Sequence, residues 1–305
     1  MEAQRRAEAL NLRYCRRLPG RGYFMSSLPL NLLFLTVLST TLVGGCRIED
    51  RFIFHPDHVT DRDPSHIGLT FENVFFTTQD GIRLHGWFIP HQEARATLLW
   101  FHGNAGNISD RLLNIKLLHD RINTNIFIFD YRGYGRSEGS VSEKGTYLDG
   151  EAAIAYLLGR DDATARKLIL FGRSLGAAVA AEMATRFTTL GLILESPFVS
   201  IREMAQEIFP SLPIGWLLRT RYDTLEKVRL VKTPILVLHG DRDATVPFAH
   251  GKRVFEVASQ PKRFHRIVGA SHNDTFVVGG EKYYEALREF IESTFAANEK
   301  IELSP

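Results

Sequence analysis

Short apolar runs alternate with alanine-rich or amphipathic segments along most of this chain. The runs at 97–101, 167–171, 190–194 and 234–239 have the length and composition of buried strands. The alanine-rich segment 177–186 favours a helix packed close to its preceding strand. Strands that alternate with helices are typical of a mainly parallel central sheet with helices on both faces, so the pattern predicts an α/β fold.

Two parts of the pattern depart from this alternation. Segments 73–78 and 82–90 flank Gln79-Asp80-Gly81, which is a hairpin signal, so the sheet is expected to open with antiparallel strands. Between about 198 and 231 the alternation lapses, and prolines interrupt an apolar stretch. We expect a short helical cap there. Its apolar residues either line an acyl pocket or simply pack the cap onto the body.

A pentapeptide between the strand at 167–171 and the helix at 177–186 has the spacing of a nucleophile elbow, Gly172-Arg173-Ser174-Leu175-Gly176. Such an elbow is a sharp turn that raises a serine hydroxyl above the end of a strand. A side chain at either glycine would collide with the neighbouring strand or helix. Chance also produces this spacing, so the interpretation depends on whether an acid and a histidine follow.

Both partners follow in the chain order expected for this elbow, which is serine, then acid, then histidine. The strand at 234–239 runs into a loop that holds Asp241 and Asp243. A further strand at 263–268 runs into a loop that holds His272. The carboxyl ends of strands meet at one edge of an open α/β sheet, and active sites form at that edge.

The residue types suit acyl transfer. A serine hydroxyl is a poor nucleophile at neutral pH, so an adjacent histidine must take its proton, and a carboxylate fixes the imidazole tautomer. We therefore assign Ser174 as the nucleophile, His272 as the general base and then acid, and Asp243 as the residue that orients the imidazole. Asp241 and, more weakly, Glu195 remain rival acids.

Not every histidine at a strand end is a candidate base. His239 ends a strand beside Gly240, and we interpret it as a packed, hydrogen-bonded residue. The non-catalytic interpretation of His272 is a loop histidine that faces water, and that of Ser174 is a small residue in a tight turn.

Acyl transfer also needs N–H donors for the negative charge that develops on the carbonyl oxygen. One predicted donor is the N–H of Leu175, directly after the nucleophile. The second is assigned to Asn104, in the loop His102-Gly103-Asn104-Ala105-Gly106-Asn107 that follows the strand at 97–101. The alternative is a glycine-rich turn with no catalytic part. This loop lacks the spacing of a phosphate or dinucleotide loop, so no nucleotide site is expected.

Taken together, six motifs resemble the α/β-hydrolase superfamily. Within it, the chain looks like the single-domain serine hydrolases that include membrane-associated depalmitoylases and uncharacterised bacterial relatives. The resemblance implies the α/β-hydrolase fold, the same triad and the same oxyanion hole. It also implies that 130–137 is a structural turn near the pocket. The motifs are His102 to Asn107, Asp130 to Ser137, Gly172 to Gly176, Glu195 to Phe198, His239 to Asp243 with Val246-Pro247, and Ser271 to Asn273.

The amino terminus carries a separate signal. An apolar stretch at 28–43 follows several arginines, is too short for a confident membrane span, and ends in small residues. Val43-Gly44-Gly45-Cys46 resembles the bacterial lipoprotein cleavage box, which would make Cys46 the lipid-modified first residue. We therefore expect a leader at 1–45 and a hydrolase domain at 46–305, in a lipoprotein of the bacterial cell envelope. An uncleaved membrane anchor, a secreted protein and a start at Met25 stay open.

Charge and cysteine content exclude several function classes. The chain has 37 Lys and Arg against 35 Asp and Glu, and the expected leader holds six of the former and two of the latter. The mature domain would be slightly acidic, so nucleic-acid binding is not expected. The two cysteines, Cys15 and Cys46, offer neither a disulfide within the domain nor a zinc site. No metal or cofactor is expected.

These observations lead to a hypothesis of a membrane-tethered serine hydrolase that cleaves carboxylic esters or thioesters through an acyl-enzyme. Its partner would be a small-molecule or acylated substrate. An aminopeptidase-like or amide-cleaving enzyme is the alternative within the same chemistry. A catalytically silent lipoprotein that keeps the scaffold for binding is the alternative of a different class. The physiological substrate and the oligomeric state cannot be derived from these motifs.

Overall fold

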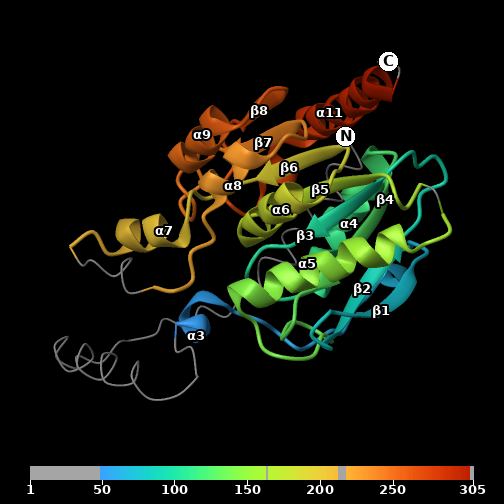
Figure 1. Cartoon of the computed structure of the whole chain (residues 1–305), viewed down its shortest axis with the longest axis horizontal. Helices are drawn as coiled ribbons and strands as arrows, with labels where there is room; N and C mark the ends of the chain where they lie inside the picture. The colour runs from blue at the N-terminus through green and yellow to red at the C-terminus, as the bar shows by residue number, and fades with distance from the viewer. Residues whose placement is uncertain (1–48, 163, 212–217, 303–305) are drawn as a thin grey trace. The chain divides into compact units, whose positions relative to one another are not determined.

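The structure is a computed structural model that describes residues 49–162, 164–211 and 218–302. Its centre is an eight-stranded sheet in the order β1-β2-β4-β3-β5-β6-β7-β8 (Figure 1). The strands are β1 (Glu72–Thr77), β2 (Arg83–Ile89), β3 (Thr97–Phe101), β4 (Asn125–Asp130), β5 (Leu168–Arg173), β6 (Gly191–Glu195), β7 (Ile235–Gly240) and β8 (Lys262–Ile267).

Helices connect most of these strands. They are α3 (Asp50–Ile53), α4 (Leu112–Arg121), α5 (Glu143–Leu158), α6 (Leu175–Arg186), α7 (Ile201–Ile208), α8 (Thr224–Leu230), α9 (Phe248–Val257), α10 (Thr275–Val278) and α11 (Gly280–Glu302). Two 3-10 turns, η1 (Pro64–Ile67) and η2 (Ile108–Arg111), complete the described elements.

The strand directions follow the sequence pattern. β1 pairs antiparallel with β2, and β2 pairs antiparallel with β4. All the other neighbouring strands are parallel, from β4 through β3, β5, β6 and β7 to β8. The hairpin expected around Gln79-Asp80-Gly81 is present, with Gly81 at φ 84°. The predicted mainly parallel sheet with an antiparallel start is therefore confirmed.

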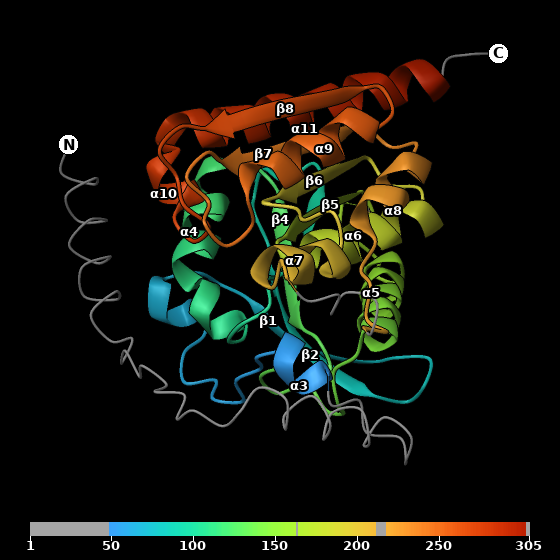
Figure 2. The same ribbon diagram turned by 90° about the vertical axis from the view of Figure 1, so that its left-hand side faces the viewer.

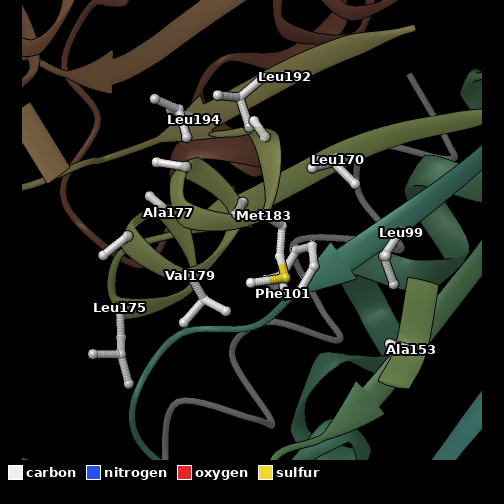
Figure 3. Close-up of a cluster of buried hydrophobic side chains, with 14 of the residues drawn as sticks. Leu99, Phe101, Ala153, Leu170, Leu175, Ala177, Val179, Met183, Leu192 and Leu194 are labelled. Carbon is white, nitrogen blue, oxygen red and sulfur yellow. The ribbon is translucent and has the colours of Figure 1, made fainter. Parts of the chain in front are cut away.

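The central strands β3 to β7 are mostly apolar because both of their faces are buried, and their polar residues lie near the strand ends. On one face, Leu99, Phe101, Leu170, Leu192 and Leu194 pack against the alanine-rich side of α6 and against Ala153 of α5 (Figure 3). α8 and α9 extend this cluster with Val228 and Val254. A fully buried Leu or Phe contributes about 1.5–3 kcal/mol, so this face is a main source of the stability that holds the elbow in place.

The alternate residues of the same strands form a second cluster on the opposite face. Trp100, Ile128 and Phe171 pack there against α4 and α11, which contribute Ile115 and Leu287 among others. Figure 2 looks onto the edge at which the parallel strands end, and α4 and α5 lie on opposite sides of the sheet in that view. The predicted arrangement of helices on both faces is confirmed.

The segment with the expected cap contains α7 and α8. α7 lies beyond the carboxyl ends of the strands, and it contacts the core through Ile201 and Met204. Ile208 and Phe209, at its far end, are exposed. α8 packs instead against α6 and α9. Residues 212–217 lie outside the described part, so the extent of the cap at 198–231 stays a prediction.

The predicted leader at 1–45 and the lipidation site at Cys46 also lie outside the described residues. Within 49–302, apart from 163 and 212–217, none of the helices combines the length and the apolar character needed to cross a bilayer. The domain boundary at 46 therefore stays a prediction.

Candidate active site

The candidate nucleophile lies in the sharp turn between β5 and α6. Ser174 has φ 54° and ψ −117°, which is a backbone conformation that residues other than glycine rarely adopt. Strain of this kind costs about 1–3 kcal/mol and persists only where the surroundings impose it. The flanking sequence imposes it here, because a buried strand runs directly into a helix with one residue between them.

Both glycines of the elbow are needed for close packing. A Cβ added to Gly172 would lie 2.6 Å from the Cα of Ala177 in α6. A Cβ added to Gly176 would lie 2.6 Å from the carbonyl oxygen of His102, at the end of β3. Both distances are shorter than those that real Cβ atoms show, and both neighbours are backbone atoms, which cannot move aside as the end of a flexible side chain could. The expected collision at each glycine is confirmed.

The fold brings the three candidate catalytic side chains into one hydrogen-bonded chain. Nε2 of His272 lies 3.0 Å from Oγ of Ser174, and Nδ1 of His272 lies 2.7 Å from Oδ2 of Asp243. The serine follows β5, the aspartate follows β7 and the histidine follows β8, so three loops at one sheet edge converge. These distances allow a proton to pass from the hydroxyl to the imidazole.

Neighbouring groups fix the position of the Asp243 carboxylate and keep it ionised. Its Oδ1 accepts hydrogen bonds from the N–H groups of Thr245 at 2.9 Å and Val246 at 2.8 Å. Burial raises the pKa of Asp243, but hydrogen bonds to His239 and His272 outweigh that effect, and the pKa lies well below its usual range. The carboxylate therefore stays ionised at neutral pH, as an orienting residue requires.

The rival residues have other partners. Asp241 accepts from the N–H of Gly269 at 2.7 Å and from Nε of Arg266 at 2.9 Å. The buried carboxylate of Glu195 accepts from the hydroxyl of Tyr283 at 2.7 Å. His239 is fully buried with Nε2 2.9 Å from the carbonyl oxygen of Val246, which confirms that it is a packed residue.

Two backbone segments lie close to the candidate nucleophile, the first turn of α6 and the loop after β3. Leu175 is the first residue of α6, and the N–H groups in the first turn of a helix have no partner within it. The positive end of the helix dipole also favours negative charge at this position. The loop with Asn104 lies alongside, since a Cβ added to Gly103 would be 3.6 Å from Cβ of Ser174.

The side chain of Asn104 is engaged away from this position. Its Oδ1 accepts from the N–H of His55 at 3.1 Å and from the hydroxyl of Tyr134 at 2.8 Å, and its Nδ2 donates to the carbonyl oxygen of Ile53 at 2.5 Å. The donor that the prediction needs is therefore the backbone N–H of Asn104. The side chain fixes the loop that carries it.

His102 adds a contact that the sequence did not reveal. Its Nδ1 donates to the carbonyl oxygen of Gly103 at 2.7 Å. The carbonyl and the N–H of a trans peptide point in opposite directions, so this bond sets the direction of the Asn104 N–H. Burial lowers the pKa of His102 to about 3, so the ring is neutral at physiological pH. Only its place beside Gly103, in the loop after a strand, could have indicated this role.

Among the residues that the structure describes, no group of three or more His, Cys, Asp and Glu side chains is placed to hold a metal ion.

Sheet order, strand directions and the turn after β5 define an α/β-hydrolase fold. Comparison with solved structures agrees. An esterase of Pyrococcus furiosus, Pf2001, superposes with a TM-score of 0.66 over 78% of this chain and 99% of its own, at 21% sequence identity. This identity is low, so the likeness concerns the fold alone.

Sequence relatives then identify the family. An uncharacterized protein of Mycobacterium tuberculosis is 34% identical, over 88% of this chain and 96% of the relative. The alpha/beta hydrolase domain-containing protein WAV2 of Arabidopsis thaliana is also 34% identical, over 75% of this chain and 81% of its own. A family described as serine aminopeptidase, S33, matches residues 92–223, which include Ser174 but neither Asp243 nor His272. The chain belongs to the α/β-hydrolase superfamily, and it is a hydrolase.

Proposed function

We propose that this protein is a serine hydrolase that cleaves carboxylic ester or thioester bonds through a covalent acyl-enzyme. The observation that carries the proposal is the continuous chain of short contacts from Ser174 Oγ through the His272 imidazole to the Asp243 carboxylate. A neutral imidazole accepts at one nitrogen only if the other carries the proton, and the ionised carboxylate selects that tautomer.

The proposed reaction has two stages. His272 takes the hydroxyl proton as Ser174 Oγ attacks the acyl carbonyl, and the N–H groups of Leu175 and Asn104 stabilise the oxyanion. The imidazolium then protonates the departing alcohol or thiol, which leaves an ester on Ser174. In the second stage His272 activates a water, which attacks this ester, and the returned proton restores the serine hydroxyl.

The substrate preference is tested with a ladder of acyl-chain lengths, each offered with an oxygen and with a sulfur leaving group. We expect turnover of both kinds of bond, since the triad activates the nucleophile whichever atom leaves. With an activated leaving group, the first turnover should appear as a burst if the acyl-enzyme accumulates. Absence of turnover on every ester and thioester, together with turnover of amides, would overturn the proposal.

An aminopeptidase-like or amide-cleaving activity is the second candidate. The description of the family that matches residues 92–223 supports it. The same triad would serve, but the leaving amine must be protonated by His272 before the bond breaks. Peptides with a free amino terminus, compared with the same peptides acetylated there, distinguish this candidate from an esterase. A silent binding role is the remaining alternative, and turnover of any of these substrates excludes it.

The membrane attachment is proposed from sequence alone. A lipid on Cys46 would tether the domain at the cell envelope beside acylated substrates, whereas an uncleaved anchor or a secreted form would leave the cysteine unmodified. Treatment with globomycin should leave a longer precursor if the lipid is added, and an unchanged size would contradict the anchor.

The pH profile is expected to show no step from Asp243 in the usual range of an aspartate, about pH 4. Hydrogen bonds to His239 and His272 hold the pKa of Asp243 well below that range, so its carboxylate stays ionised there and keeps orienting the imidazole. Steady-state kinetics in a constant-ionic-strength buffer series measures the logarithm of kcat/KM across this range. A break in the profile near pH 4 would show that the carboxylate titrates at its usual pKa.

A further inference from the structure

A buried ion pair lies directly beside the candidate triad. Arg173 is the last residue of β5 and Glu195 the last of β6, and the two are paired across the sheet. Nε of Arg173 lies 3.3 Å from Oε1 of Glu195, with side chains 8% and 0% exposed. Such a pair is weak grounds for stability by itself, because taking both charges out of water costs about as much as their attraction returns.

The guanidinium of Arg173 also reaches the loop that carries the candidate base. Its Nη2 donates to the carbonyl oxygen of His272 at 2.6 Å and lies 3.4 Å from Oδ1 of Asn273. Arg173 therefore spans from Glu195 to the backbone of the histidine itself. A planar guanidinium with donors in a fixed fork can hold both partners at once, which an ammonium group cannot do in the same way.

The carboxylate of Glu195 holds the same loop from its other side. It accepts from the hydroxyl of Thr275, three residues after His272, and from the hydroxyl of Tyr283 in α11. The backbone of Glu195 contacts the elbow as well, because its carbonyl oxygen accepts from the N–H of Ser174 at 2.9 Å. Glu195 thus connects the serine turn with the 275 end of the short segment 272–275, and Arg173 holds its 272 end.

We infer that Arg173 and Glu195 are positioning residues that hold the His272 imidazole in line between Ser174 and Asp243. The inference rests on the proposed function of these three residues. Among the described contacts, neither Arg173 nor Glu195 touches the hydroxyl of Ser174 or the imidazole of His272, so both act through the His272 carbonyl, the Thr275 hydroxyl and the backbone of Ser174. Displacement of a reacting group by about 1 Å can lower a rate by about 10²-fold, which sets the expected size of the effect.

The test uses the double variant Arg173→Met/Glu195→Gln. It removes both charges together and leaves no uncompensated ion, while the amide that replaces the carboxylate still hydrogen-bonds to the hydroxyls of Thr275 and Tyr283. The link to the His272 carbonyl is lost. We expect kcat to fall about 10²-fold while KM changes less than about threefold, because the orientation for chemistry is lost and substrate binding is not.

A second ion pair in the same protein provides a matched control. Arg132 and Asp149 lie 2.8 Å apart with side chains also 8% and 0% exposed, and they contact none of the triad residues. The double variant Arg132→Met/Asp149→Asn should lower the unfolding temperature and leave kcat near that of wild type. If both double variants lose the same fraction of kcat, or if Arg173→Met/Glu195→Gln keeps the wild-type kcat, the inference is wrong.

Two further measurements keep the test decisive. If the double variant does not fold, Arg173→Lys keeps the charge opposite Glu195 but cannot also reach the His272 carbonyl, and we expect a wild-type unfolding temperature with reduced kcat.

The low-field proton NMR signal of the Nδ1–H between His272 and Asp243 reports positioning without any turnover. We expect this signal in wild type and in the control, and its loss in the variant. An inactive wild type that shows the same difference in signal would refute the proposed function and leave the positioning role standing.

Discussion

Replacement of Ser174 by alanine is expected to lower kcat by about 10⁴- to 10⁶-fold and to abolish labelling by a fluorophosphonate probe. The hydroxyl is the only group within hydrogen-bonding distance of Nε2 of His272 among the described contacts, so the variant leaves the base with nothing to deprotonate. Residual turnover would come from the oxyanion donors and from substrate binding. The fold should persist, because the Ser174 N–H that bonds to the carbonyl of Glu195 is backbone.

Ser196 offers a matched control for this experiment. It also has a positive φ, 47°, at the end of the neighbouring strand, and it is fully buried. Its hydroxyl has no hydrogen-bond partner among the described residues. Ser196→Ala should therefore keep both turnover and labelling. Equal probe labelling of wild type and Ser174→Ala would remove the proposed nucleophile, whatever the effect at Ser196.

Much of this fold could be predicted from the sequence because the central strands are short and apolar over most of their length. Runs such as 97–101 are buried on both faces, so composition and length identify them without any knowledge of their neighbours. The elbow could be predicted for a similar reason. Gly172 and Gly176 are needed because a Cβ at either position would collide with neighbouring backbone. The chain order of serine, acid and histidine then places three loops at one sheet edge.

The contacts that hold the candidate site in place could not be predicted, since they join residues distant along the chain. The Asn104 side chain bonds to Ile53 and His55, about fifty residues earlier, in a segment with no periodic pattern. Arg173 meets the His272 carbonyl 99 residues later. The sequence identifies Glu195 only as a rival acid, because a carboxylate after a strand does not indicate which groups will surround it.

The sequence pattern did not predict α5, and the reason is different. Its buried side has Ile154 and Leu157 near the end of the helix, but its first half is buried through Gly145, Thr146, Asp149 and Gly150. Gly150 allows a close approach to Met183 of α6, since a Cβ there would lie 2.8 Å from the sulfur. A helix that packs through small residues shows little hydrophobic periodicity, so tertiary packing rather than the pattern defines it.

Replacement of Asp243 by asparagine is the second change with a large expected effect, a fall in kcat of about 10⁴-fold, as for the corresponding change in serine proteases. The hydrogen bonds at this residue decide how the amide would lie. Oδ1 accepts from the N–H groups of Thr245 and Val246, so the amide oxygen must take that place. The NH₂ group then faces Nδ1 of His272, where Oδ2 now accepts.

That orientation selects the wrong tautomer of the base. An NH₂ group donates to Nδ1, which must then be unprotonated, so the proton moves to Nε2 and the ring can no longer accept from Ser174 Oγ. Steady-state kinetics gives the loss in kcat. Asp241→Asn is the control, because Asp241 bonds to Gly269 and Arg266 and not to the imidazole. A larger loss for Asp241→Asn than for Asp243→Asn would transfer the orienting role to Asp241, and equal, small losses would mean that neither carboxylate fixes the tautomer.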